Sequence, residues 1–275
     1  LCATRILEMI TQRGYSGTIW PLRKYVRVVR PISRNEAFFR LTMLPGEQAQ
    51  VDWAHFGSIE IGATRRALSC FVMVLSYSRA IYACFVLDQT LESFLRCHVA
   101  AFDAFGGVPR VLLYDNLKAA VLERIGDVIR FNPRLLDLAG YYHFAPTPVA
   151  RARGNEKGRV ERAIRYLRES FFAARTFHSL DHLNRLLGTW IADIANARLV
   201  PDDIHKRTVA DALVQDRERL LALPSHAFTC DHVRAVASGK TPYLRFDGND
   251  YSIPHTLVRR PLTLVASDVR VRILD

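Results

Sequence analysis

Hydrophobic positions recur at helical spacing within the first thirty residues. An apolar stripe over residues 3–13 stops at Gly14, and a second stripe from Pro21 to Val29 has a basic opposite face. That face carries Arg23, Lys24 and Arg27. Helix, short glycine-containing turn and basic helix is the outline of a helix-turn-helix, although an ordinary αα-hairpin has the same pattern. Because the first stripe starts with the first residues, we expect part of the natural protein to lie upstream.

From residue 49 onward the pattern changes to short apolar runs and alternating positions, which are typical of strands. Strands are predicted over residues 50–56, 66–76, 80–86, 111–114 and 144–149. Helices are predicted over residues 91–105 and 133–142, with a long helix from about residue 155 and two more near 180–197 and 207–221. This order predicts an α/β fold in which helices flank a mixed sheet, as in ribonuclease-H-like folds.

After Pro224 the chain changes to short strands. Residues 243–246 and 251–253 flank Asp247-Gly248-Asn249-Asp250, a strong hairpin pattern, and residues 263–265 and 269–273 add another pair. About fifty residues of this kind predict a small SH3-like β-barrel. The predicted organisation is the end of a helix-turn-helix at 1–30, a linker at 31–46, the ribonuclease-H-like domain at 47–177, a helical connector at 178–223 and the barrel at 224–275.

The charge of the chain favours a polyanionic partner. Its 38 Lys and Arg oppose 27 Asp and Glu, for a net charge of +11. Nucleic acid is the commonest such partner, and a solvated basic surface is the alternative. The five cysteines form no C-x-x-C pair, no signal peptide is visible, and the most apolar stretch, 67–87, is interrupted by polar residues. These features predict a cytoplasmic protein outside the membrane.

Three acidic residues stand where acids are expensive to bury. Asp52 lies within an apolar strand, Asp115 directly follows the predicted strand 111–114, and Glu161 lies on the long helix. A buried carboxylate must be paired or hold a metal. Two metal ions about 4 Å apart need shared carboxylates, and oxygen-only ligands favour Mg²⁺ or Mn²⁺. Taken singly, each acid is more often a cap, turn or ion-pair residue, and Asp115-Asn116 fits a helix cap.

The three acids lie within three motifs that occur in order along the chain. These are Gly-Glu-Gln-Ala-Gln-Val-Asp-Trp at 46–53, Leu-Tyr-Asp-Asn-Leu-Lys-Ala-Ala-Val at 113–121 and Gly-Asn-Glu-Lys-Gly-Arg-Val-Glu-Arg-Ala at 154–163. Together they resemble the three motifs of IstA-type insertion-sequence transposases, which are similar to retroviral integrases. The resemblance covers essentially the whole chain.

This resemblance implies a function. The family's Asp-Asp-Glu triad falls on Asp52, Asp115 and Glu161, with two Mg²⁺ (or Mn²⁺) ions per site. The implied activity is cleavage at transposon ends followed by strand transfer into target DNA, by a homo-oligomer acting at the bacterial nucleoid. No G-x-x-x-x-G-K-[ST] motif is present, so any use of ATP must come from a partner. The resemblance implies an AAA+ helper of the IstB kind.

Basic residues gather around Glu161 and are predicted to bind DNA phosphates. Surface ion pairs are the alternative, but the nearby acids are too few to pair with all of them. With the basic helix near the start, the predicted DNA-binding residues are Arg23, Lys24, Arg27, Lys118, Arg153, Lys157, Arg159, Arg165 and Arg168.

Glu156 competes with Glu161 as the third metal ligand. The two are five positions apart, so on a helix they point about 140° away from one another. Glu161 adjoins the apolar stripe that begins at Val160, whereas Glu156 lies in the first turn, where acids commonly cap helices. We therefore predict Glu161. Two other functions stay open: a ribonuclease-H-like nuclease or resolvase without strand transfer, and a DNA-binding protein without activity.

Overall fold

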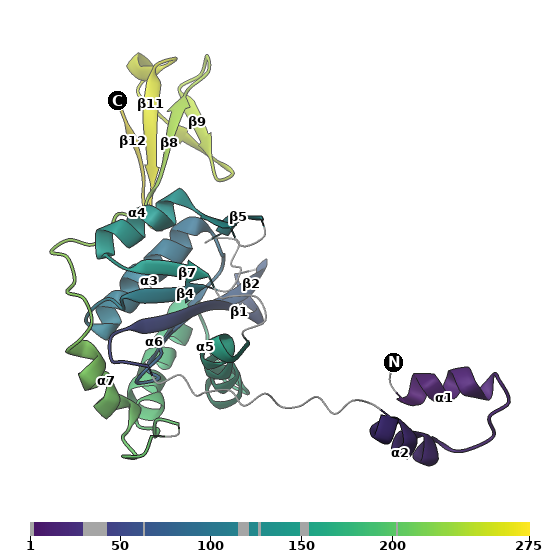
Figure 1. Ribbon diagram of the computed structural model, residues 1–275. Coiled ribbons are helices and arrows are strands. Elements are labelled where there is room, and N and C mark those ends of the chain that lie inside the picture. The colour runs from purple at the N-terminus through teal and green to yellow at the C-terminus, as the bar shows by residue number, and fades with distance from the viewer. Residues whose placement is uncertain are drawn as a thin grey trace. The chain divides into compact units, whose positions relative to one another are not determined.

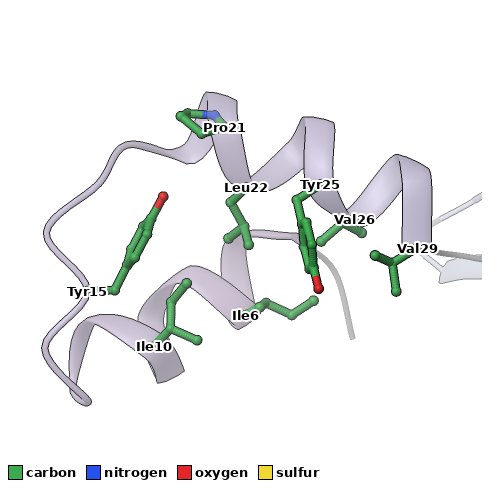
Figure 2. A pocket seen from close by; sticks show the side chains of 8 residues that line it. All are labelled: Ile6, Ile10, Tyr15, Pro21, Leu22, Tyr25, Val26 and Val29. Carbon is green, nitrogen blue, oxygen red and sulfur yellow. The ribbon is translucent and has the colours of Figure 1, made fainter.

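The computed structural model describes residues 3–29, 43–62, 64–114, 121–125, 128–148, 154–201 and 203–275. The chain divides into two compact units, one of residues 1–41 and one of residues 42–275. Helices α1 (Ala3–Thr11) and α2 (Ile19–Val29) make up the described part of the first unit. Their apolar side chains face one another across a groove of about 560 Å³, which Tyr15 closes at the loop end (Figure 2). This arrangement fits both a helix-turn-helix and an αα-hairpin.

A five-stranded sheet organises the second unit (Figure 1). Its strands are β1 (Gln48–Ile61), β2 (Thr64–Leu75), β3 (Ile81–Val86), β4 (Val111–Tyr114) and β7 (Ala145–Pro148), in the spatial order β3-β2-β1-β4-β7. The pairs β3–β2 and β2–β1 are antiparallel, whereas β1–β4 and β4–β7 are parallel. The mixed sheet confirms the predicted ribonuclease-H-like fold class.

Helices cover both faces of this sheet. Alternate residues of β2 enter two separate cores, Phe71 and Met73 on one face and Cys70 and Val72 on the other. The first core contains residues of α3 (Leu91–Phe105), α4 (Pro133–Tyr142) and α7 (Val209–Arg217). The second contains residues of α5 (Gly154–Tyr166), the π-helix η1 (Leu167–Phe172), α6 (Leu180–Trp190) and the π-helix η2 (Ile191–Ala195). We call these the α3 face and the α5 face.

Asp216 of α7 fastens the beginning of β1 to the rest of the sheet. Its carboxylate accepts hydrogen bonds from the backbone N–H groups of Gly46 (2.6 Å) and Ser78 (3.1 Å), and burial raises its pKa. Gly46 has a φ of +68°, and a Cβ there would lie 2.5 Å from the carbonyl carbon of Arg219. Glycine is therefore required where the first motif begins.

The C-terminal segment consists of short antiparallel strands. These are β8 (His232–Ala237), β9 (Tyr243–Phe246), β10 (Asn249–Ser252), β11 (Pro261–Ala266) and β12 (Val271–Leu274), with the 3₁₀ turn η3 (His255–Leu257). Asp247 and Gly248 both have positive φ in the two-residue turn between β9 and β10, as the hairpin pattern predicts. The strands fit an SH3-like domain around the small core of Leu244, Ile253 and Leu262.

Several predicted bounds differ from the structure. Helices α3 and α4 have the predicted limits, but β1 continues to Ile61, five residues beyond the prediction. A hairpin of β5 (Val121–Ile125) and β6 (Val128–Phe131) was not predicted, although Gly126-Asp127 separates two runs of strand-forming residues. Strand β8 was also missed, because its residues, His-Val-Arg-Ala-Val-Ala, show no clear alternation of polar and apolar side chains.

Candidate active site on the five-stranded sheet

The register between β1 and β4 ends immediately before two of the motif acids. Val51 is paired with Tyr114 in the parallel ladder, so the next residues of the chain are Asp52 on one strand and Asp115 after the other. Asp115 lies outside the described residues. The carboxyl ends of parallel strands are where open sheets place their ligand sites.

Alternation along β1 assigns Asp52 to the α5 face. Val51 belongs to the core of the α3 face, whereas Ala54 and Phe56 belong to the core of the α5 face. Asp52 is half-buried, and its carboxylate accepts a hydrogen bond from the backbone N–H of Trp53 (2.8 Å). The acid is therefore accessible from the side of the sheet that α5 covers.

Glu161 lies at the border of the buried stripe of α5, as predicted. Val160, Ile164, Leu167 and Phe171 are all buried, whereas Glu161 is exposed. Helix α5 packs on β1 and β2, and the Gln50 side chain accepts a hydrogen bond from the backbone N–H of Val160 (3.1 Å). Asp52 follows Gln50 by two residues, and Glu161 directly follows Val160. Both acids are therefore close in sequence to the contact between Gln50 and α5. The side chain of Glu156 lies outside the described residues.

The donor set of this region fits a hard divalent cation. The three motifs supply carboxylate side chains and contain no Cys or His. Mg²⁺ and Mn²⁺ prefer such oxygen ligands. Within the described residues there is no group of three His, Cys, Asp or Glu side chains placed to hold a metal ion. Asp115, the second acid of the predicted triad, falls outside those residues.

Behind β4, on the α3 face, a buried hydrogen-bond chain joins strand to helix. His98 Nδ1 lies 2.7 Å from the carbonyl oxygen of Phe94, so Nδ1 carries the proton and Nε2 accepts from the Tyr114 hydroxyl at 3.0 Å. Both side chains are fully buried, and burial lowers the pKa of His98 to about 4 and raises that of Tyr114. These hydrogen bonds hold Tyr114, the residue that precedes Asp115, against helix α3.

The predicted DNA-binding residues fall in three groups. Arg23, Lys24 and Arg27 lie on the exposed side of α2, with the Arg23 guanidinium 5.7 Å from the Trp20 ring. On α5, which bears Glu161, Arg165 is exposed and Arg159 is half-buried, and Arg168 is exposed on the π-helix η1 that follows. Arg168 also donates to the carbonyl oxygen of His55 (3.0 Å) and stacks on Phe56. Lys118 and Arg153, and the Lys157 side chain, lie outside the described residues.

Sequence reasoning missed Gln50, His98 and Tyr114. A signal was present for Gln50, because it is a polar residue two positions before Asp52 on the same face of an apolar strand. No local pattern pairs His98 with Tyr114, since sixteen residues separate them in sequence.

No helix in the described part of the chain combines the length and apolar character that crossing a bilayer requires.

Comparisons with known proteins define first the class and then the family. Residues 44–142 match the Integrase core domain, and residues 223–275 match the Mu transposase C-terminal domain. The transposase for insertion sequence element IS21 of Pseudomonas aeruginosa is 32% identical over 270 residues, which cover 98% of this chain and 68% of that protein. The chain belongs to the insertion-sequence transposases of the IstA type.

Other relatives match over less of their length. The putative transposase for insertion sequence element IS5376 of Geobacillus stearothermophilus is 38% identical over 189 residues, 69% of this chain and 47% of that protein. The chain thus spans about half to two thirds of the relatives' lengths. Among solved structures, the simian T-cell lymphotropic virus intasome has a chain that aligns with a TM-score of 0.49 and 15% identity, over 94% of this chain and 89% of that one.

Proposed function

We propose that this protein is a DNA transposase that cuts the ends of its element and joins them to target DNA. The parallel register of β1 and β4 carries the proposal. If the alternation of each strand continues by one residue, Asp52 and Asp115 are neighbours on the α5 face, where α5 also presents Glu161. Membership in the transposase family supports the same function.

In the proposed site, Asp52, Asp115 and Glu161 would hold two Mg²⁺ or Mn²⁺ ions. When bound, these ions would activate the attacking oxygen and stabilise the leaving oxygen. Water attacks a phosphodiester at the transposon end, the bond to the 3′ oxygen breaks, and a 3′ hydroxyl is released. That hydroxyl then attacks a target phosphodiester, so that one new bond replaces one that breaks.

Basic residues beside the acids would bind the DNA backbone. Arg165 is exposed on α5, the helix that carries Glu161, and Arg168 is exposed on η1, which follows it; cations there attract phosphates without reading sequence. We further propose that the protein assembles as a homo-oligomer on two DNA ends, in the bacterial cytoplasm, with an IstB-like AAA+ ATPase as helper. The match to a transposase C-terminal domain favours this function over a bare nuclease.

A strand-transfer assay tests the proposal. The chain is mixed with a labelled transposon-end oligonucleotide and a target plasmid, and the products are separated on a denaturing gel. We expect Mg²⁺-dependent cleavage and joined products, both abolished by EDTA. Cleavage without joining would favour the nuclease, binding without cleavage would favour the inactive DNA-binding protein, and full activity in EDTA would refute the metal site. Light scattering on end DNA tests the oligomer, which a one-to-one complex would exclude.

A further inference from the structure

Gln50 is a buried amide in an apolar part of the sheet. Its side chain is 2% exposed and stands in β1 between Ala49 and Val51, both also buried. Burying an amide is unfavourable unless its polar atoms are hydrogen-bonded. An apolar residue of similar size would fill the same space without that requirement, so the amide group itself needs an explanation.

The amide oxygen is used to fix a helix to the strand. Gln50 Oε1 accepts from the backbone N–H of Val160 at 3.1 Å, and Val160 is itself only 2% exposed. Neighbouring apolar side chains of α5 and β1 share one core, and because hydrophobic packing is non-directional, it leaves the position of the helix along the strand some freedom. A hydrogen bond to one defined amide removes that freedom, because its distance and angle requirements are narrow.

The contact is close in sequence to two of the proposed metal ligands. Asp52 follows Gln50 by two residues on the same strand face, a separation of about 7 Å. Glu161 is the residue after Val160, one step of about 1.5 Å along the helix axis. A shift of α5 along β1 would change the separation of the two carboxylates directly.

We propose that Gln50 is a positioning residue that sets the place of Glu161 relative to Asp52, and so the affinity of the site for its divalent ions. The inference rests on the proposed function, since it presumes that these carboxylates hold the ions. Residues that orient metal ligands without contacting the metal typically weaken metal affinity by about 10- to 100-fold when they are removed.

Asn184 provides a matched control on the same face of the sheet. Its amide joins α6 to β3, accepting from the backbone N–H of Phe85 (2.8 Å) and donating to the Phe85 carbonyl oxygen (3.0 Å). The chemistry is that of Gln50, a side-chain amide that joins a helix to a strand. Strand β3 is two strands away from β1, on the far side of β2.

The test is a titration of the chain with Mn²⁺, in which the electron paramagnetic resonance signal measures the concentration of the free ion. Gln50→Met keeps the size of the side chain but loses the amide, and we expect its dissociation constant for Mn²⁺ to rise about tenfold or more. Asn184→Leu should lower the melting temperature comparably and leave the dissociation constant within about twofold. Gln50→Glu keeps an acceptor for the Val160 amide and should bind Mn²⁺ at least as tightly as the unmodified chain.

The outcomes separate this inference from the proposed function. Unchanged binding by Gln50→Met, equal weakening by Asn184→Leu, or weakening by Gln50→Glu overturns the positioning role while the metal site stands. If Gln50→Met does not fold, Gln50→Asn, whose shorter amide cannot reach Val160 in place, must show the rise in its stead. An unmodified chain that binds Mn²⁺ no better than Asp52→Asn overturns the proposed function and the inference together.

Discussion

On the α3 face of the sheet, two polar side chains are buried among aromatic rings and hydrogen-bond to one another. His98 and Tyr114 are fully buried there, and Phe94 packs against both. On the α5 face, by contrast, Asp52 is half-buried and Glu161 is exposed. Because successive strand residues point to opposite faces, the single step from Val51 to Asp52 along β1 leads from the buried core of the α3 face to a half-buried acid on the α5 face. Stability and chemistry are therefore separable by mutation in this part of the molecule.

The largest expected effect is loss of cleavage on the α5 face. Asp52→Asn and Glu161→Gln each keep the shape of the side chain and remove its charge. We expect the cleavage rate of labelled end DNA to fall by about 10³ or more, the scale of losing a direct transition-state contact. Melting temperature and DNA affinity should change little, because Asp52 is only half-buried and Glu161 is exposed.

Glu156→Gln is the control for Glu161→Gln. It carries the same change on the same helix and should leave the cleavage rate within a few-fold, at about 1 kcal/mol of stability or less. The reverse pattern, with Glu156→Gln inactive and Glu161→Gln active, would show that the third ligand is misassigned.

The next effect belongs to the α3 face and depends on pH. The pKa of His98 is lowered to about 4 in the folded chain, against about 6.5 for an unfolded one. The unfolded chain therefore takes up a proton first, so stability is complete above pH 6.5 and falls as the pH drops towards 4. The expected loss is about 3 kcal/mol, measured by urea unfolding at pH 7.5 and 4. His98→Gln should flatten this dependence; parallel profiles for the two proteins would contradict the assignment.

A smaller loss of stability is expected from Tyr114→Phe. The ring and its packing remain, but His98 Nε2 loses its donor in a buried place. We expect a loss of about 1–2 kcal/mol in the free energy of unfolding. In a double-mutant cycle with His98→Leu, the two changes should be non-additive by about 1 kcal/mol. Additive effects would mean that the hydrogen bond contributes nothing.

The smallest effect concerns DNA affinity. Arg165→Gln removes an exposed cation from the helix that bears Glu161 and should lower the slope of log affinity against log salt by about one unit. Arg185→Gln removes an exposed cation from α6 and serves as the control. Equal salt slopes for both variants, measured by fluorescence anisotropy, would place the DNA elsewhere.

The sequence predicted local elements better than long-range pairing. Helix α3 was predicted to the residue because Gly106 provides a left-handed cap, with φ of +79°. The π-helical continuation of α5 was not, since its i→i+5 bonds, such as Ala173 N–H to the Arg168 carbonyl, leave no pattern in composition. The register of β1 on β4 joins segments about sixty residues apart, which no local period specifies.

The candidate site divides in the same way. Asp52 and Glu161 came from motifs and from the cost of burying acids, but the structure leaves Asp52 half-buried and Glu161 exposed, so that cost does not apply to Glu161. Gln50 escaped notice because a polar residue in a strand ordinarily faces solvent, and only the position of α5 shows that this one is covered. The place of a partner helix is a tertiary fact that strand periodicity does not contain.

The most direct measurement of the central claim is the anomalous scattering of Mn²⁺ in crystals of this chain. The account predicts two peaks about 4 Å apart, the spacing of two-metal sites, with carboxylate oxygens of Asp52, Asp115 and Glu161 around them. Peaks that lack contact with Asp52 and Asp115, or that take Glu156 in place of Glu161, would contradict it.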